Sequence, residues 1–365
     1  MSVQGNTIQE GDSTLVFKNR PFYLDFDRKF QYNEVSMKVE PGNVSMPAKA
    51  NNEFWVLLLG GSAMEGMGSN KDGEWLDITG QADYPWNESI PYYLEKYLHK
   101  VYPEKKVKVF NTAASSYTLG QSFLRYRELA KKFDFDFVVS LDGQNDPPAL
   151  QNGETSIDYM KKDWEKRPSK SFPASWLLFL TQRSAAVYQL KQQFFHWRIN
   201  RRSEKNIEDS FPRRKFWENQ PILAFNTGKN DEGVDRAVAS YFSSLEQFDR
   251  ELRSEQKNHL FLLQPHILFR DSTRVGKKER AVLSYFSAYN NDPVKNNFLI
   301  KQRDEWRKRF GATDSQFVLL SQADTLSEEV FVDYCHFSSS MNQFMARFIG
   351  DKIVSQVATS TNQPN

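Results

Sequence analysis

The stretch FWVLLLGGSAMEGMG, residues 54–68, begins with six apolar residues and then changes character at Gly60-Gly61-Ser62. A short apolar run without polar alternation is typical of a strand that is covered on both faces in a parallel sheet. Two glycines after such a strand let the backbone turn tightly and let another molecule approach. The stretch therefore predicts a buried strand whose carboxyl end presents the hydroxyl and N–H of Ser62 at the sheet edge.

Four more runs share this apolar character, and helix-like stretches separate them. The further predicted strands are residues 107–110, 135–141, 260–263 and 317–320. The predicted amphipathic helices are residues 86–102, 121–133, 237–255 and 344–357. Strands that alternate with helices indicate an α/β sandwich around a mostly parallel five-stranded sheet.

The alternation is interrupted once, by more than a hundred residues before the fourth strand. We therefore expect four segments: an irregular N-terminal arm (1–50), a core (51–147 and 236–358), a helical insertion (148–235) and a polar tail (359–365). Within the insertion, residues 176–198 form an apolar helical pattern followed by basic residues. Such a pattern suits a membrane surface, but burial against the insertion's own core is the more common use, and we favour it.

Composition excludes several classes of protein. The net charge is +2 over 365 residues, which gives no reason to expect a nucleic-acid partner. The single cysteine, Cys335, excludes an intramolecular disulfide and a CxxC zinc site, and we expect no metal ion. No run reaches the about 18 apolar residues of a membrane span, and the first residues lack a signal-peptide pattern. The expected location is cytoplasmic, or the cell envelope if an anchor has been removed.

Small and polar residues follow each predicted strand, at the edge where open parallel sheets bind ligands. They are Gly60-Gly61-Ser62, residues 111–116, residues 142–146, Gln264-Pro265-His266 and, near the C-terminus, residues 332–337. A phosphate loop is disfavoured because the first segment lacks the P-loop lysine and GxGxxG. A serine, a histidine and an aspartate instead suit nucleophilic catalysis, because a serine hydroxyl needs a base and the base needs an orienting partner. Asp333 and His336 are three residues apart, which keeps them close in a turn.

A tetrahedral oxyanion needs hydrogen-bond donors, and three candidates are available. They are the backbone N–H of Ser62, the backbone N–H of Ser116 and the side-chain amide of Asn145.

The order of these motifs resembles the SGNH hydrolases, also called the GDSL esterase/lipase family. The matching segments are Gly60-Gly61-Ser62, residues 111–118, residues 143–146 and residues 333–336. The resemblance implies a flavodoxin-like three-layer sandwich, with Ser62 as nucleophile, His336 as base, Asp333 as its orienter and Asn145 as oxyanion donor. Ser116 stands where the family usually has glycine. Only a backbone N–H is needed there, so serine can serve if its backbone angles permit.

Four further residues are candidates for substrate binding, namely Gly61, Gly143, Gln264 and His266. For His266 we favour a second interpretation, in which the side chain caps a turn. The stretches FLLQP (261–265) and HFSSSMN (336–342) resemble a bacterial branch of the family that is often associated with cell-surface carbohydrates.

The sequence thus predicts a serine esterase that removes a small acyl group, most simply acetyl, from a carbohydrate, without a cofactor. Three alternatives stay open: an O-acetyltransferase with the same triad, a lipase or thioesterase with the insertion as lid, and a catalytically inactive carbohydrate-binding or assembly protein.

Overall fold

The computed structural model describes most of the predicted core and little of the predicted insertion. The described residues are 9–12, 14–19, 21–22, 30–68, 82–146, 214–228, 232–289, 291–311, 314–327 and 329–361. Residues 147–213, which include the predicted helix over 176–198, lie outside them, as does most of the polar tail. Within the predicted insertion the structure describes a short helix, α9 (Arg214–Trp217), and the start of α10 (Glu232–Ser254), four residues before the predicted boundary.

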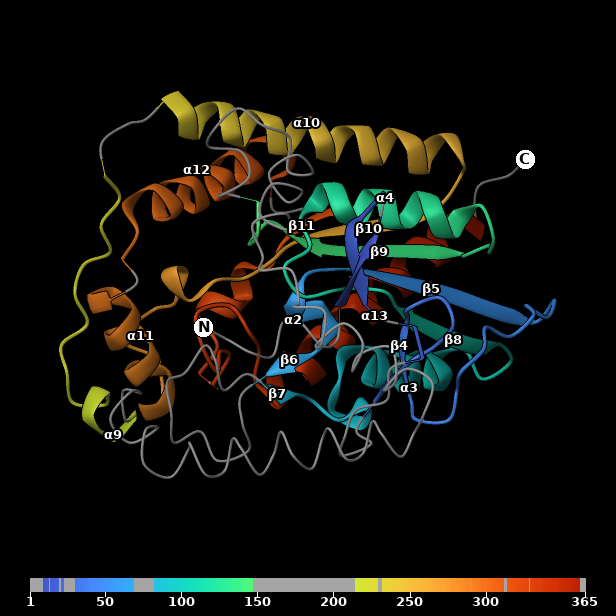
Figure 1. The fold of residues 1–365 in the computed structure, drawn as a ribbon, viewed down its shortest axis with the longest axis horizontal. Coiled ribbons are helices and arrows are strands. Elements are labelled where there is room, and N and C mark those ends of the chain that lie inside the picture. Colours follow the sequence, from blue (N-terminus) through green and yellow to red (C-terminus); the bar gives the residue numbers. More distant parts are fainter. Residues whose placement is uncertain are drawn as a thin grey trace, which may run out of the picture.

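One seven-stranded sheet forms the centre of the fold (Figure 1). Its strands are β3 (Gln31–Tyr32), β4 (Lys38–Val39), β5 (Glu53–Gly60), β8 (Lys106–Asn111), β9 (Phe137–Asp142), β10 (Asn258–Leu263) and β11 (Phe317–Leu319). They lie in the order β11-β10-β9-β5-β8-β4-β3, and the first five are mutually parallel. These five are the predicted strands, in the flavodoxin-like order 2-1-3-4-5. The α/β prediction is confirmed, with two more strands than expected.

The two extra strands come from the N-terminal arm, which is less irregular than predicted. β3 and β4 pair antiparallel, and β4 adds to the edge strand β8. β1 (Gln9–Asp12) and β2 (Val16–Asn19) form a separate hairpin, and β6 (Met67–Gly68) pairs with β7 (Ala82–Asp83) further along. Asn19, at the end of β2, donates hydrogen bonds to Glu65 Oε1 at 3.0 Å and to the Ala113 carbonyl at 3.1 Å. The arm is thereby attached to the segment that carries Ser62.

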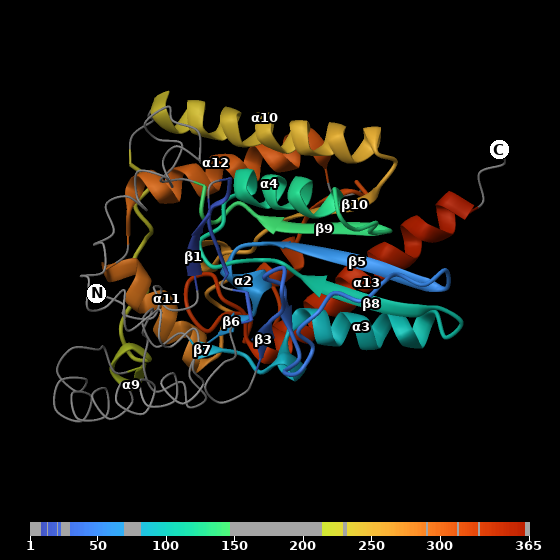
Figure 2. The ribbon, with the colours of Figure 1, turned by 45° about the vertical axis from the view of Figure 1, so that its right-hand side comes forward.

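Helices cover both faces of the sheet and complete three layers. The main ones are α3 (Ile90–Val101), α4 (Leu119–Ala130), α10, α11 (Lys277–Tyr289), α12 (Pro293–Phe310) and α13 (Ser339–Thr361), with 3₁₀ turns η1 (Trp86–Glu88), η2 (Ile267–Phe269) and η3 (Ser321–Asp324). Figures 1 and 2 both place α4, α10 and α12 on one face, and α3 and α13 on the other. The predicted helices over 86–102, 121–133, 237–255 and 344–357 correspond to η1 with α3, α4, α10 and α13.

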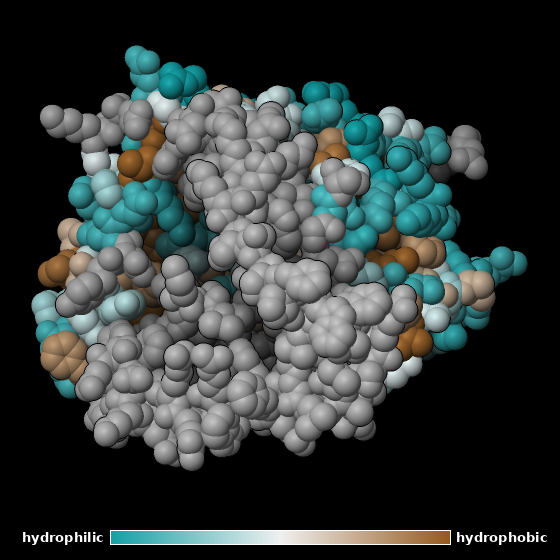
Figure 3. All heavy atoms as spheres, in the orientation of Figure 1, coloured by the Kyte–Doolittle hydropathy of each residue, from teal (hydrophilic) through white to brown (hydrophobic). Residues whose placement is uncertain are grey.

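The alternation of side chains along β5 explains why the sheet needs both layers. Leu57 and Leu59 belong to the core beneath α4 and α10, whereas Val56 and Leu58 belong to the core beneath α3 and α13. All four are at most 1% exposed, which is the burial that a continuous apolar run predicts. The outward face of α10 is hydrophilic, as Figure 3 shows along the upper rim of the molecule. Within the described residues, no helix combines the length and apolar character needed to cross a bilayer.

Candidate active site

The turn after β5 places Ser62 at the carboxyl end of the sheet. Gly60 has φ +145°, and a Cβ on it would collide with the Leu141 carbonyl oxygen of the neighbouring strand β9. Only glycine therefore fits at the end of β5. The chain then turns at Gly61 into the short helix α2 (Ser62–Glu65), whose first residue is Ser62. Ser62 keeps 9% of its surface exposed.

Ser62, His336 and Asp333 form one continuous hydrogen-bonded chain. The Ser62 Oγ lies 2.6 Å from His336 Nε2, and His336 Nδ1 lies 2.6 Å from Asp333 Oδ2. Serine and histidine are 274 positions apart in sequence, so the fold has brought them together. A histidine bonded in this way can remove the serine proton while the carboxylate fixes its tautomer and orientation.

The environment of the pair favours an ionised Asp333 and a basic His336. Burial disfavours the Asp333 carboxylate, but His336 and the backbone N–H groups of Cys335 and His336 outweigh burial and lower its pKa to about 2. Those two N–H groups donate to Asp333 Oδ1 at 2.9 and 2.8 Å. Burial lowers the pKa of His336, but Asp333 and Cys335 together outweigh burial and raise that pKa well above 6.5. The imidazole is thus suited to accept a proton.

Neighbouring segments hold the loop that carries Asp333 and His336. The Ile267 N–H donates to the Tyr334 carbonyl at 3.0 Å, and Gln264 Nε2 donates to the Cys335 carbonyl at 3.0 Å. On the far side, the Tyr84 hydroxyl donates to the Phe337 carbonyl at 3.0 Å. These contacts fix the loop from the end of β10 and from the segment before α3.

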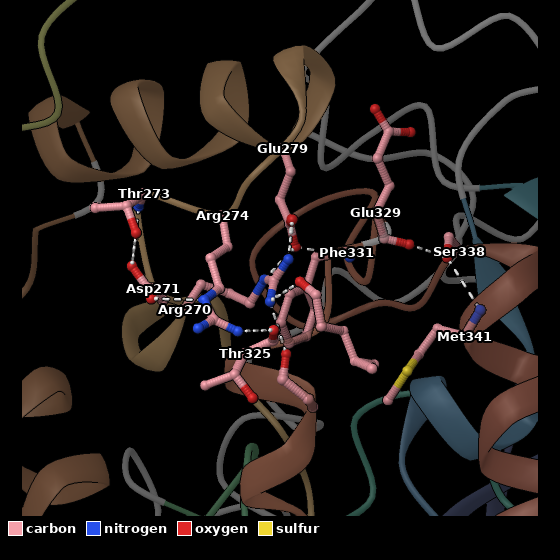
Figure 4. Close-up of polar contacts among 12 residues, drawn as sticks. Arg270, Asp271, Thr273, Arg274, Glu279, Thr325, Glu329, Phe331, Ser338 and Met341 are labelled. Carbon is pink, nitrogen blue, oxygen red and sulfur yellow. Dashed lines mark hydrogen bonds and ion pairs between the residues drawn. The ribbon is translucent and has the colours of Figure 1, made fainter.

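A buried ion pair anchors the chain just before this loop (Figure 4). Arg270 Nε and Nη2 donate to the two carboxylate oxygens of Glu279 at 2.9 and 2.7 Å, and both side chains are 0% exposed. Arg270 Nη1 also donates to the carbonyls of Ala323 and Leu326, and Glu279 accepts the Phe331 N–H at 3.2 Å. The pair thereby joins α11 to the chain between η3 and Asp333. Sequence reasoning missed this pair, because two charges nine residues apart carry no pairing signal.

Two of the predicted oxyanion donors, Asn145 and the loop with Ser116, lie beside Gly61, the residue before Ser62. Asn145 Nδ2 donates to the Tyr117 carbonyl at 2.9 Å. A Cβ on Gly61 would lie 2.7 Å from Asn145 Nδ2 and 3.4 Å from the Tyr117 carbonyl oxygen, so the absence of a side chain at Gly61 leaves room for this contact. Ser116 precedes Tyr117 and has φ +67°, the left-handed conformation that glycine adopts without strain. The structure thus brings Gly61, Asn145 and the Ser116 loop together, and their role as donors stays a prediction.

Two buried carboxyl groups support the loop that carries Asn145. Asp146 accepts the Leu119 N–H, which ties the loop to the first turn of α4. Burial and the nearby Asp142 raise the pKa of Asp146 to about 8. Asp142 accepts the Ser122 hydroxyl at 2.9 Å, and burial raises its pKa to about 6. These contacts give both carboxyl groups a structural role in holding the loop.

The predicted substrate-binding residues have contacts that also stabilise the site. His266 Nδ1 accepts the Leu268 N–H at 3.0 Å, which is the turn cap that we favoured from the sequence. The Gln264 amide is engaged with the Cys335 carbonyl. Gly143 has φ +113°, and a Cβ on it would lie 2.6 Å from Leu263 Cδ1. Substrate contact stays a prediction for all four residues, Gly61, Gly143, Gln264 and His266.

One group of potential metal ligands is present among the described residues, although the sequence suggested none. Ligand atoms of Asp333, Cys335 and His336 lie within 4.8 Å of one another. His336 Nδ1 and Asp333 Oδ2 already share a hydrogen bond at 2.6 Å, and Cys335 Sγ lies 3.8 Å from His336 Nδ1. An ion at this position would have to replace the bond that orients His336. The geometry therefore fits a proton-transfer pair better than a metal centre.

No family model and no curated protein matches this sequence. Among solved structures, a putative lipolytic protein of the G-D-S-L family from Desulfitobacterium hafniense DCB-2 is similar at 11% identity and TM-score 0.37, over 83% of this chain and 99% of that chain. Axe2, an acetylxylan esterase from Geobacillus stearothermophilus, is similar at 14% identity and TM-score 0.35, over 84% of this chain and 96% of that chain. LAE5, an alpha/beta hydrolase enzyme from the metagenome of Lake Arreo, Spain, is similar at 12% identity and TM-score 0.31, over 84% and 97% of the two chains. Scores this low indicate neither a family nor an activity, so the geometry around Ser62 has to support any functional proposal.

Proposed function

We propose that this protein is a serine ester hydrolase of the SGNH type, which removes a small acyl group, most simply acetyl, from a carbohydrate. The observation that supports it is the chain of 2.6 Å contacts from Ser62 Oγ through His336 to Asp333. An inactive binding protein would have no need to maintain this geometry. The acetyl and carbohydrate parts rest on the family resemblance of the sequence motifs.

The reaction proceeds in two steps through an acyl-enzyme. His336 Nε2 takes the proton from Ser62 Oγ as the oxygen attacks the ester carbonyl carbon. The tetrahedral oxyanion is held by the N–H groups of Ser62 and Ser116 and by the Asn145 amide, which turns from the Tyr117 carbonyl toward it. His336 then gives its proton to the departing alcohol oxygen as the carbon–oxygen bond breaks. In the second step His336 activates water, and the acid leaves as Ser62 recovers its proton.

The test is hydrolysis of p-nitrophenyl acetate between pH 6 and 9 by wild type, Ser62→Ala and His336→Ala. We expect wild type to turn over and both variants to lose about 10³-fold or more in kcat. Each variant must retain the wild-type circular dichroism spectrum for the comparison to hold. Equal rates in all three folded proteins would contradict the proposal.

Transfer of the acyl group to a sugar hydroxyl uses the same residues and differs only in the acceptor of the second step. Release of free acetate in the presence of excess xylo-oligosaccharide supports hydrolysis. Acetylated sugar formed in place of free acetate would instead identify a transferase.

A further inference from the structure

Beside the triad lies a lysine that, among the residues that the structure describes, forms no ion pair with a carboxylate. Lys295 lies in the first turn of α12 and is half-buried. Its Nζ stands 4.6 Å from the centre of the Tyr334 ring. Tyr334 is the residue between Asp333 and Cys335, so this lysine contacts the loop that carries Asp333 and His336.

The Tyr334 ring lies between Lys295 and several other rings, one of which is the imidazole of His336. Its centre lies 6.2 Å from the His336 ring, 5.8 Å from the His266 ring and 5.0 Å from the Phe286 ring. His266 adds no positive charge here, because burial and the nearby Lys295 lower its pKa well below 6.5. The ammonium group of Lys295 therefore stands over the Tyr334 ring, whose own neighbours include the His336 ring.

The carboxylates nearest to Lys295 are engaged elsewhere. Asp292 caps α12 and accepts the backbone N–H groups of Val294 at 2.9 Å and of Lys295 at 3.2 Å. Asp333 is held by His336 and by two backbone N–H groups. Among the residues that the structure describes, no carboxylate oxygen forms an ion pair with Lys295 Nζ, although many other surface lysines have such a partner.

A partly desolvated ammonium without a carboxylate partner gains from any anion that reaches it. The ring of Tyr334 offsets part of the desolvation, since cation–π contacts contribute on the order of 1 kcal/mol. Burial nevertheless lowers the pKa of Lys295, and the nearby Asp292 and Asp333 offset only part of this effect. An incoming carboxylate or phosphate oxygen would complete that solvation.

We propose that Lys295 recognises a negatively charged group, a carboxylate or a phosphate, on the alcohol part of the ester that Ser62 attacks. The substrate class is then an acylated acidic carbohydrate rather than a neutral one. This inference rests on the proposed esterase function and specifies its substrate. Lys295 acts by binding and takes no part in the transfer of protons.

The test compares two acetate esters of similar shape, 4-acetoxybenzoate, which is anionic, and 4-acetoxybenzamide, which is neutral. We measure kcat/KM by release of the phenol, for wild type, Lys295→Met and Lys295→Arg. Methionine keeps the unbranched stem and removes the charge, whereas arginine keeps the charge. Lys301→Met is the matched control, because Lys301 lies on the same helix and pairs with Asp235.

We expect Lys295→Met to lower kcat/KM for the anionic ester about tenfold and for the neutral ester less than about twofold. Lys295→Arg should keep most of the preference, and Lys301→Met should leave both values unchanged. Raising the salt concentration to about 0.5 M should reduce the wild-type preference for the anion. A third ester, 4-acetoxyphenyl phosphate, then distinguishes a carboxylate from a phosphate. The anion that Lys295 binds better is the one whose ester loses more kcat/KM in Lys295→Met.

Equal losses on the anionic and neutral esters would overturn this inference alone, because Lys295 would then act on the triad or on the fold. Unchanged rates on both charged esters in Lys295→Met would overturn it as well. Absence of turnover of every ester by folded wild type would instead overturn the proposed esterase function, and this inference with it.

Discussion

Replacing Glu279 by glutamine would remove the carboxylate that pairs with the buried guanidinium of Arg270. Both side chains are 0% exposed, so water cannot take over the lost contact. Breaking a buried ion pair in this way costs about 3–5 kcal/mol. For a chain of 365 residues, with an unfolding entropy of about 2.1 cal/mol/K per residue, this corresponds to a fall in Tm of about 4–6.5 °C.

The double variant Arg270→Met/Glu279→Gln tests whether the two charges act as a pair. It removes both charges but leaves the carbonyls of Ala323 and Leu326 without their donor, at about 1–3 kcal/mol each. Each single variant leaves the other charge of the pair buried, whereas the double variant removes both, so we expect the double variant to be less destabilised than the sum of the two single variants, by about 2 kcal/mol or more. Urea unfolding of the four proteins gives the cycle.

An exposed pair supplies the control. Arg236 and Glu232 on α10 stand 3.7 Å apart, with side chains 66% and 95% exposed. Glu232→Gln should change the free energy of unfolding by less than about 0.5 kcal/mol. The reasoning is refuted if Arg270→Met and Glu279→Gln add within about 0.5 kcal/mol, since independent sites behave in that way.

Three further predictions concern the site itself. Ser116→Gly should raise the free energy of unfolding by about 0.5–1 kcal/mol, because glycine relieves the φ of +67° at some cost in chain entropy, and kcat should stay within about threefold because the backbone N–H remains. Gly61→Ala should lower kcat about 10–100-fold in a folded protein, because its Cβ would press on the Asn145 amide at 2.7 Å. The pH dependence of kcat/KM should show an acid limb centred above pH 6.5, since the base must be neutral and the Asp333 charge raises the pKa of His336. Asp333→Asn should move that limb to lower pH and reduce kcat about 10³–10⁴-fold.

A specific result would contradict each of these predictions. Loss of stability in Ser116→Gly would mean that the serine side chain makes a contact worth more than the backbone strain. Full activity of Gly61→Ala would remove Asn145 from the oxyanion site. An acid limb that does not move in Asp333→Asn would mean that a group other than His336 is titrating.

The five parallel strands could be predicted because burial on both faces leaves a direct mark on sequence. Continuous apolar runs of four to seven residues, such as residues 54–59, are typical of buried strands in a chain with this composition. β3 and β4 could not be found in this way, because each has two residues and follows no period. They are strands because the edge of β8 offers unpaired backbone groups.

Helices α11 and α12 were both missed, and for α12 the reason is a sequence rich in charged residues. In α12, apolar positions such as Phe298, Leu299 and Trp306 are scattered among many lysines and arginines, so the amphipathic pattern is weak. Its buried surface includes polar groups such as Asn296 and Gln302, which only the tertiary structure explains.

The sequence likewise predicts one part of the candidate site and not the other. The motifs around Ser62 and His336 could be found because each follows a strand or stands at a fixed short spacing. Contacts between distant segments could not be found from the sequence. The contact of Lys295 with Tyr334 is the clearest example, since the two residues are 39 positions apart with no motif between them. The place of Lys295 beside the triad depends on how α12 packs at the carboxyl edge of the sheet.

The central claim is that Ser62 is a nucleophile activated by His336, and covalent labelling tests it most directly. Wild type and His336→Ala are incubated with a fluorophosphonate, and the adducts are measured by intact mass and located by peptide mass spectrometry. We expect one adduct per chain on Ser62 in wild type, and a labelling rate lower by about 10³-fold in His336→Ala. A folded wild-type protein that forms no adduct, or forms it on another residue, would contradict the account.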